Sequence, residues 1–147
     1  MRIVLDTNVL VSGLLTPFGT CGEIVRMLTS GEVELCVDAR ILAEYEAVLR
    51  RPKFSIAPSQ IVIVLDYIQA MSESFGAIPL QHPLPDEDDH PFLEIARSSR
   101  ADCLVTGNLK HFPKRCCVDV RVVSPDQFVA YFRERSAAKS SARGKPE

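Results

Sequence analysis

The sequence lacks the features that mark secreted, membrane-spanning or nucleotide-binding proteins. Its longest aliphatic run, Ile61 to Leu65, ends at Asp66 and is far too short to cross a bilayer. Asp6 interrupts the apolar start of the chain, so no signal-peptide core forms. No G-x-G-x-x-G or P-loop motif follows a predicted strand, which leaves a nucleotide-binding function without a motif. These absences predict a cytoplasmic protein with no membrane partner.

The number and spacing of the cysteines argue against disulfide bonds and against a structural zinc site. The five cysteines are odd in number and show no C-x-x-C spacing, which excludes a simple disulfide framework and a typical zinc site. Cys36 and Cys103 lie within apolar segments, where cysteine behaves as a small hydrophobe. The adjacent Cys116 and Cys117 are interpreted as loop thiols. A reducing compartment is therefore expected.

The chain also lacks an overall basic charge. It has 17 basic and 19 acidic residues and a net charge of −2, so no general field attracts nucleic acid. Basic residues nevertheless predominate after Arg133. Residues 136–147 are rich in Ser, Ala, Lys and Gly and are expected to form a disordered basic tail. Residues 1–135 have the length of one domain.

Apolar segments alternate with helical patterns through that domain. Strands are predicted at residues 2–5, 33–37, 77–80, 103–105 and 118–123. Helices are predicted at 9–15, 22–28, 39–51, 60–75, 91–99 and 126–133, with a short one at 108–112. Strands that alternate with helices are typical of an α/β domain, in which helices cover both faces of a parallel sheet.

Polar side chains follow two of the predicted strands, where an open parallel sheet binds its ligands. Asp6 follows the first strand, and Thr106 and Asn108 follow the strand at 103–105. Asp89 shares the apolar face of its helix and is expected to point towards the sheet. Carboxylate, hydroxyl and amide oxygens are the ligands that a hard cation prefers.

The helix at 39–51 offers two further carboxylates. Glu44 and Glu46 border opposite sides of its apolar stripe, so spacing does not choose between them. Carboxylates held together raise one another's pKa unless a cation neutralises them, which favours Mg²⁺ or Mn²⁺. Such an ion holds substrate phosphate and lowers the pKa of an attacking water, so phosphodiester hydrolysis is predicted. The competing structural interpretation makes Asp6 a helix cap and the glutamates solvated surface residues.

Other polar residues are assigned outside the site. Asp102 precedes its strand, at the opposite edge of the sheet, and is given a structural role. His82, His90 and His111 are scattered through polar loops and are expected to form no ligand cluster. For the acidic run at 86–89, which includes Asp89, the competing structural interpretation is a loop that leads into a helix N-terminus.

Four segments in order resemble the signatures of the PIN domain family, and most closely its toxin–antitoxin subgroup. They are residues 4–10 (VLDTNVL), 41–45 (ILAEY), 85–93 (PDEDDHPFL) and 101–108 (ADCLVTGN), and the segment at 123–128 also fits. The resemblance covers residues 1–132. It implies a three-layer α/β/α sandwich with a mostly parallel central sheet, and a metal-dependent nuclease domain that acts mostly on RNA.

The resemblance also implies a set of site residues and favours Glu44 over Glu46. The metal ligands for Mg²⁺ or Mn²⁺ would be Asp6, Glu44 and Asp89. Thr106 matches a position where a hydroxyl contacts a metal-bound water or the substrate. Asn108 stands where the family has a fourth carboxylate.

Asn108 is the main departure from the family pattern. Asn keeps a carbonyl ligand but removes one negative charge, which weakens a second metal more than the first. Asp86 and Asp88 are extra acids near the site that would serve as outer or substitute ligands. Catalysis with one metal, low activity and compensation by these acids all stay open.

Two functions follow from the resemblance. The first is a metal-dependent endoribonuclease, the toxin of a toxin–antitoxin pair, with RNA as substrate, a small antitoxin as partner and a homodimer as the expected assembly. The second is a catalytically weak RNA-binding or partner-binding module. The basic residues that could contact an RNA backbone are Arg40, Arg50, Arg51, Lys53, Lys110, Lys114 and Arg115.

Two phosphoryl-transfer alternatives fit the sequence less well. A phosphatase of the Asp-x-Asp type needs a second Asp where Asn8 stands. A receiver-like domain needs an Asp after a central strand and a Lys after a later one, which Asn108 and Lys110 supply only imperfectly.

Overall fold

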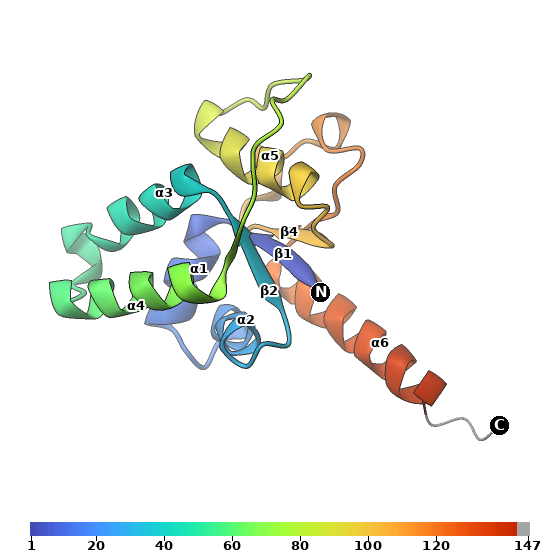
Figure 1. Cartoon of the computed structure of the whole chain (residues 1–147), viewed down its shortest axis with the longest axis horizontal. Coiled ribbons are helices and arrows are strands. Elements are labelled where there is room, and N and C mark those ends of the chain that lie inside the picture. The colour runs from blue at the N-terminus through green and yellow to red at the C-terminus, as the bar shows by residue number, and fades with distance from the viewer. Residues whose placement is uncertain (144–147) are drawn as a thin grey trace.

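A computed structural model describes residues 1–143, and residues 144–147 lie outside the described part. Its strands form one parallel sheet in the order β3-β2-β1-β4-β5 (Figure 1). The strands are β1 (Arg2–Leu5), β2 (Glu34–Val37), β3 (Glu73–Ser74), β4 (Cys103–Val105) and β5 (Val122–Val123). In the central strand, Ile3 pairs with Leu35 of β2 on one side and Cys103 of β4 on the other.

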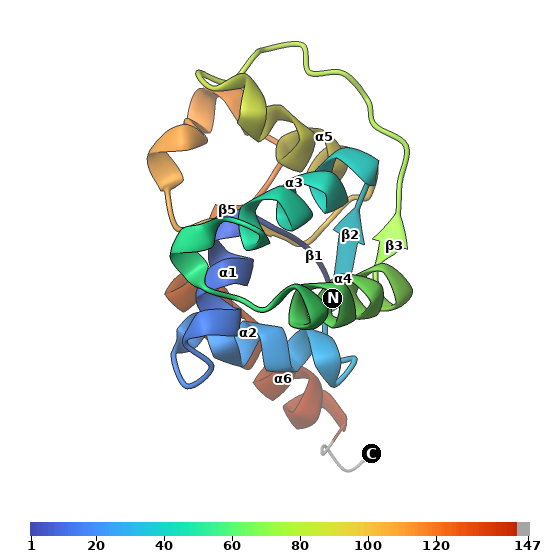
Figure 2. The same cartoon turned by 90° about the vertical axis from the view of Figure 1, so that its left-hand side faces the viewer.

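Helices cover both faces of the sheet. They are α1 (Thr7–Leu15), α2 (Thr20–Thr29), α3 (Ala39–Leu49), α4 (Pro58–Met71), α5 (His90–Ser98) and α6 (Pro125–Arg143). Short 3-10 turns form η1 (Pro52–Phe54), η2 (Glu87–Asp89), η3 (Leu109–His111) and η4 (Lys114–Cys116). Figure 2 places α5 on one side of the sheet and α2 and α6 on the other. The predicted three-layer α/β/α fold is confirmed.

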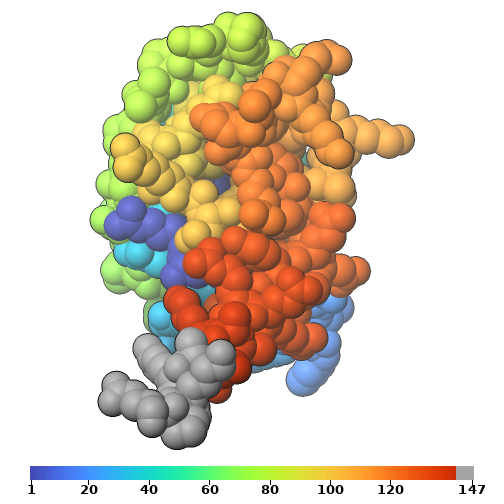
Figure 3. Space-filling model, turned by 90° about the vertical axis from the view of Figure 1, so that its right-hand side faces the viewer, coloured from blue at the N-terminus to red at the C-terminus, as the bar shows by residue number. Residues whose placement is uncertain are grey.

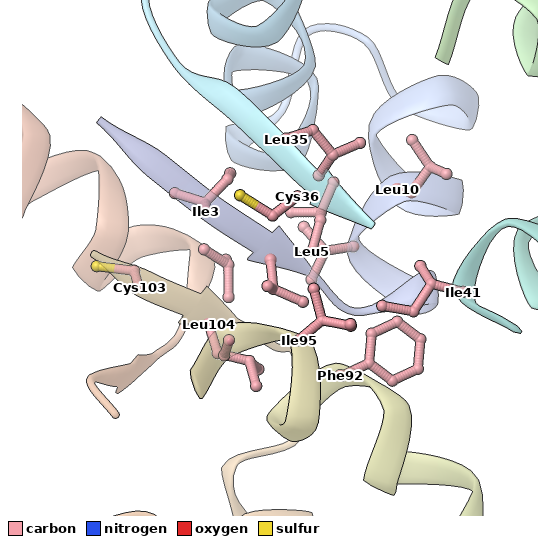
Figure 4. Close-up of a cluster of buried hydrophobic side chains, with 14 of the residues drawn as sticks. Ile3, Leu5, Leu10, Leu35, Cys36, Ile41, Phe92, Ile95, Cys103 and Leu104 are labelled. Carbon is pink, nitrogen blue, oxygen red and sulfur yellow. The ribbon is translucent and has the colours of Figure 1, made fainter. Parts of the chain in front are cut away.

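The core explains why the central strands are apolar at every position. Ile3, Val4 and Leu5 are completely buried because helices cover both sides of β1. In Figure 4, Phe92 lies beside Ile41 at the end of β1. Complete burial of one such side chain contributes about 1.5–3 kcal/mol to folding. This packing fixes α3 and α5, and therefore the acids that they carry, against the end of β1.

The topology creates a switch point between β1 and β4. From β1 the chain adds β2 and β3 on one side, and then returns to place β4 and β5 on the other side. The connections therefore diverge at the carboxyl ends of β1 and β4, and in open parallel sheets this is where ligands bind. Asp6 and Thr106 follow these two strands directly.

The structure differs from the predicted elements mainly at β3 and β5, the two outer strands of the sheet. The helix predicted at 60–75 ends at Met71, and the strand expected at 77–80 is replaced by β3 at Glu73–Ser74. The backbone N–H of Phe75 donates to Val37, so pairing with β2 selects this earlier segment. The last strand is also shorter than predicted and contains Val122 and Val123.

The C-terminal helix is longer than predicted. Residues 136–143, expected to be disordered, continue α6 as far as Arg143, and the end of the expected tail lies outside the described residues. The added segment contains Ala, Lys, Arg and Ser but neither Gly nor Pro before position 144, so its residues tolerate helical backbone. The division of the chain at residue 135 stays a prediction.

The sequence argued against a disulfide framework and against a membrane-spanning segment, and the described residues bear on both points. All five cysteines lie in the described part and are free thiols, with Cys36 and Cys103 buried as predicted. Within residues 1–143, no single helix is long and apolar enough to cross a membrane. In that part of the chain, α1 and α2 taken together have the length and apolar composition of a membrane span, but a bend of 96° separates them.

Candidate metal and active site

Asp6 lies where β1 ends, beside β4. Its backbone N–H donates to the carbonyl of Val105 (2.9 Å), and its Oδ2 accepts from the hydroxyl of Thr106 (2.7 Å). Only 7% of Asp6 is exposed. Two neighbouring strands therefore hold this carboxylate in a fixed position.

Thr106 is completely buried and supports Asp6 from β4. Its Oγ1 donates to Asp6 and accepts the backbone N–H of Asn108 (3.0 Å). The family resemblance implies that this hydroxyl contacts a metal-bound water or the substrate, and that role stays a prediction. In the structure the hydroxyl orients Asp6 and the loop that carries Asn108, whose side chain is half-buried.

Glu44 reaches the same region from α3. Its Oε2 accepts a hydrogen bond from the hydroxyl of Thr7, the residue after Asp6. Glu46, by contrast, is exposed and pairs with Arg50 (3.4 Å). The structure thus brings Glu44 towards Asp6, whereas the apolar stripe left the two glutamates equivalent.

Four contacts set the position of α3. The Asp38 Oδ1 accepts the backbone N–H of Ile41 (2.9 Å) and fixes the first turn. The fully buried Tyr45 donates its hydroxyl to the carbonyl of Leu5 (2.6 Å), directly before Asp6. Arg40 contacts both Asp38 (2.8 Å) and Glu94 (2.7 Å), which links α3 to α5.

Asp89 enters from the start of α5 and is 8% exposed. Its Oδ2 is buried and has no hydrogen-bond partner among the described residues. The Nδ1 of His111 lies 3.1 Å from this oxygen, within ion-pair distance, but the ring is not aligned for a hydrogen bond. A buried carboxylate oxygen thus lacks the hydrogen bond that such groups normally make.

His111 corrects the prediction that the histidines form no ligand cluster. One ligand atom each from Asp86, Asp89 and His111 lie within 4.8 Å of one another. The turn η3 folds back after β4, with the His111 N–H donating to the Asn108 carbonyl (3.1 Å), and this brings the ring to Asp89. In the sequence, the only indication that His111 lies near the site is its closeness to Thr106. The intervening turn is irregular, so no helical or strand periodicity predicts where the ring points.

The remaining predicted residues lie outside this cluster. His90 Nε2 accepts the backbone N–H of Leu84 (3.0 Å), and His82 is exposed in a hollow beside Arg97. Asp102 accepts the backbone N–H of Arg2 (2.9 Å) at the opposite end of the strands, which confirms its structural role. Asp88 is exposed in η2, the turn before α5.

Burial and mutual repulsion act together on the clustered carboxylates. Burial raises the pKa of Asp6, although the hydrogen bond from Thr106 opposes this shift. Burial also raises the pKa of Glu44, and the charge of Asp6 adds to the effect. The pKa of Asp89 rises to about 6 through burial and the charge of Asp6, while His111 opposes it. A bound cation would relieve this repulsion.

The donor set fits a divalent metal ion. The ligand atoms that lie within 4.8 Å of one another are carboxylate oxygens of Asp86 and Asp89, at the two ends of η2, and an imidazole nitrogen of His111. Asp6 and Glu44 are outside this group and act on Asp89 through their charges. Figure 3 shows the neighbouring surface, on which the segment after β4 borders α5 and α6. The arrangement could hold a metal ion at the switch point, open to a ligand from outside the sheet.

Comparison with known proteins places this geometry in a family. The family model for the PIN domain matches residues 2–110. The chain is 23% identical over 145 residues to the uncharacterized protein MJ1680 of Methanocaldococcus jannaschii, covering 91% of this chain and 93% of that protein. The crystal structure of VapBC2 from Rickettsia felis, bound to a DNA fragment from their promoter, matches with a TM-score of 0.56 and 20% identity. That match covers 84% of this chain and 98% of the other.

Proposed function

The chain belongs to the PIN domain family, and we propose that it is a metal-dependent endoribonuclease that hydrolyses RNA phosphodiester bonds. The observation that supports this most strongly is that Asp6, Glu44 and Asp89 lie near enough for the charge of Asp6 to act on both other carboxyls. These acids come from three separate elements, and all three have raised pKa values. Structural carboxylates are usually paired with cations, whereas these three acids repel one another and are only partly offset by Thr106, Thr7 and His111.

In this proposal Asp6, Glu44 and Asp89 hold Mg²⁺ or Mn²⁺. The bound ion would polarise a phosphoryl oxygen and lower the pKa of the attacking water. Thr106 keeps Asp6 in one orientation by its hydrogen bond, and Thr7 does the same for Glu44. Because both supporting hydroxyls are buried, the carboxylates are oriented before a ligand arrives, which reduces the cost of binding.

Basic side chains near the cluster support an RNA substrate. Lys110 precedes His111, and Lys114 and Arg115 follow on η4, all exposed on the segment after β4. Arg51 lies close enough to Glu44 for its charge to lower the pKa of that carboxyl. Arg40 and Arg50 are less available for RNA because they pair with acids of the protein. Cations that flank an acidic centre would hold the phosphate backbone against it.

Asn108 favours a second candidate function, a catalytically weak module that binds RNA or a partner. Its amide replaces the fourth carboxylate that the family pattern predicts, so the site has one negative charge fewer. A module of this kind would keep the fold and the basic flank but hydrolyse RNA slowly.

The toxin role, a small antitoxin and a homodimer belong to the same proposal. The motifs of the toxin–antitoxin subgroup support the first two. Contact with another polypeptide is supported by α4, whose outer face exposes the large apolar side chains of Val62, Ile63 and Tyr67. Beside it, α1, α2 and α4 line an apolar pocket of about 360 Å³.

Cleavage of a mixed pool of single-stranded and structured RNA tests the proposed activity. Wild type and Asp6→Asn are compared with Mg²⁺, with Mn²⁺ and with EDTA. We expect cutting by the wild type that needs metal and is lost in Asp6→Asn, with fragment ends that reveal the preferred site. If neither protein cuts while both bind RNA, the binding module replaces the nuclease as the better account.

A further inference from the structure

We propose that His111 is a nitrogen ligand of the metal at this site, and that with Asp86 and Asp89 it makes the site select transition metals over Mg²⁺. The inference deepens the proposed function, on which it rests for the role of the metal. It adds a ligand outside the carboxylates that the sequence predicted. It also assigns the metal a chemical class.

The first support is the unpaired oxygen of Asp89. This atom is buried on a side chain that is 8% exposed, and the described residues provide it with no hydrogen bond. An isolated buried carboxylate oxygen is costly, so such atoms are normally bonded to a donor or a cation. A carboxylate oxygen of Asp89 lies within 4.8 Å of ligand atoms of Asp86 and His111, a spacing at which one cation would contact all three residues.

The second support is the orientation of His111. Its Nδ1, rather than a carbon edge, lies 3.1 Å from the Asp89 Oδ2, yet the two atoms do not form an aligned hydrogen bond. The separation of 3.1 Å fits an ion pair with protonated His111, and it equally fits two ligand atoms of one metal ion. The turn η3 holds His111 beside Asp89 through the hydrogen bond from the backbone N–H of His111 to the carbonyl of Asn108.

The donor set then determines which metals fit. Mg²⁺ strongly prefers oxygen and keeps much of its water, whereas imidazole nitrogen suits later first-row metals. A site that adds one imidazole nitrogen to carboxylate oxygens binds Co²⁺ more tightly than Mn²⁺, and Mn²⁺ more tightly than Mg²⁺. His111 adds a neutral donor to the site but does not restore the negative charge that Asn108 removes.

Pulsed electron paramagnetic resonance of bound Mn²⁺ tests the nitrogen ligand without any RNA. Wild type, His111→Gln and the matched control His82→Gln are each loaded with Mn²⁺. Both histidines are exposed, so neither change threatens the fold. We expect ¹⁴N modulation of the Mn²⁺ echo in wild type and His82→Gln, and its loss in His111→Gln.

Calorimetric titration of the same proteins tests the selectivity. His111→Gln should lower Mn²⁺ and Co²⁺ affinity by about tenfold or more and Mg²⁺ affinity by less than about twofold. Nitrogen modulation that persists in His111→Gln, or is missing from Mn²⁺-loaded wild type, overturns the inference. An increase in metal affinity in His111→Gln overturns it as well, because His111 would then only pair with the Asp89 charge.

The two proposals fail in different ways. If Mn²⁺ binds without nitrogen and RNA is still cut, the His111 ligand is wrong and the nuclease stands. If Mn²⁺ binds through His111 and no RNA is cut, the ligand stands and the nuclease is wrong. If wild type binds no Mn²⁺, both are wrong.

Discussion

Asn108 and Asp89 show how single side chains set the charge of the site. Asp89 contributes a buried carboxylate with an unpaired oxygen, and Asn108 contributes an amide where a further carboxylate would make the repulsion larger. The site therefore balances two demands. It needs enough negative charge to attract a metal, but each added charge destabilises the metal-free protein.

Replacing Asn108 by Asp should shift that balance towards metal binding. We expect Asn108→Asp to raise Mn²⁺ affinity by about tenfold, because a hard divalent ion gains a charged oxygen ligand nearby. Titration calorimetry measures this, with Gln60→Glu on α4 as a control that adds the same charge elsewhere. An unchanged Mn²⁺ titration in Asn108→Asp would contradict the account of this position.

The raised pKa of Asp89 predicts an uncommon pH dependence of stability. In the folded protein this pKa is about 6, above the value of an unfolded Asp, so the folded state binds the proton more tightly. In EDTA, the free energy of unfolding should therefore rise as the pH falls from 7.5 to 5.5. Denaturant unfolding at both pH values measures this difference.

A matched pair of variants assigns the effect to the cluster. Asp89→Asn should reduce the dependence on pH, because the titrating carboxyl is gone. Asp66→Asn, on the exposed side of α4, should leave it intact. Equal pH dependence in wild type and Asp89→Asn would argue against a destabilising charge at Asp89.

At the scale of elements, the site depends on where α3 and α5 begin. The cap at Asp38 starts α3 and so determines that Glu44, rather than Glu46, faces Thr7. The contact between Arg40 and Glu94 then links α3 to the helix that follows Asp89. A shift of either helix by one residue would rotate its carboxylate out of the site.

Loss of the Asp38 cap should weaken this arrangement measurably. We expect Asp38→Ala to lower the free energy of unfolding by about 1 kcal/mol, since an N-cap hydrogen bond is lost. Glu46→Ala removes an exposed ion pair on the same helix and should change stability by less than about 0.5 kcal/mol. Similar values for the two variants would mean that Asp38 does not fix the start of α3.

The same elements show what sequence reasoning could predict. Asp6 and Thr106 were predictable because apolar runs defined β1 and β4, and polar residues that follow such strands meet at one edge. The choice of Glu44 needed the family resemblance, because an apolar stripe does not distinguish its two borders. His111 was missed because an irregular turn brings it to Asp89, and β3 was misplaced because pairing with β2, rather than local propensity, selects the strand.

At the scale of the whole molecule, α4 exposes an apolar face, and none of the acids proposed to hold the metal belongs to this helix. Its side chains would be costly to leave in water, and a second copy of the chain is the partner that the proposed homodimer assigns to it. The molecule would then separate its assembly surface from its chemistry. The two can accordingly be tested independently.

A charge on α4 should disrupt this assembly without unfolding the protein. Ile63 and Ile78 are both 60% exposed, but Ile63 lies on α4 and Ile78 lies in the segment after β3. We expect wild type and Ile78→Asp to be dimers and Ile63→Asp to be a monomer by size-exclusion chromatography with light scattering. A monomeric wild type, or a dimeric Ile63→Asp, would contradict the assignment of this face to a homodimer.

The central claim is that hydrolysis depends on the carboxylates gathered at the ends of β1 and β4. The most direct measurement is the rate of Mg²⁺- and Mn²⁺-dependent RNA cleavage by Glu44→Gln and Glu46→Gln. These changes are chemically identical and lie two residues apart on one helix, but only Glu44 contacts the site. We predict a loss of roughly a hundredfold or more in Glu44→Gln and a change within about twofold in Glu46→Gln. Equal activity of the two variants would contradict the account.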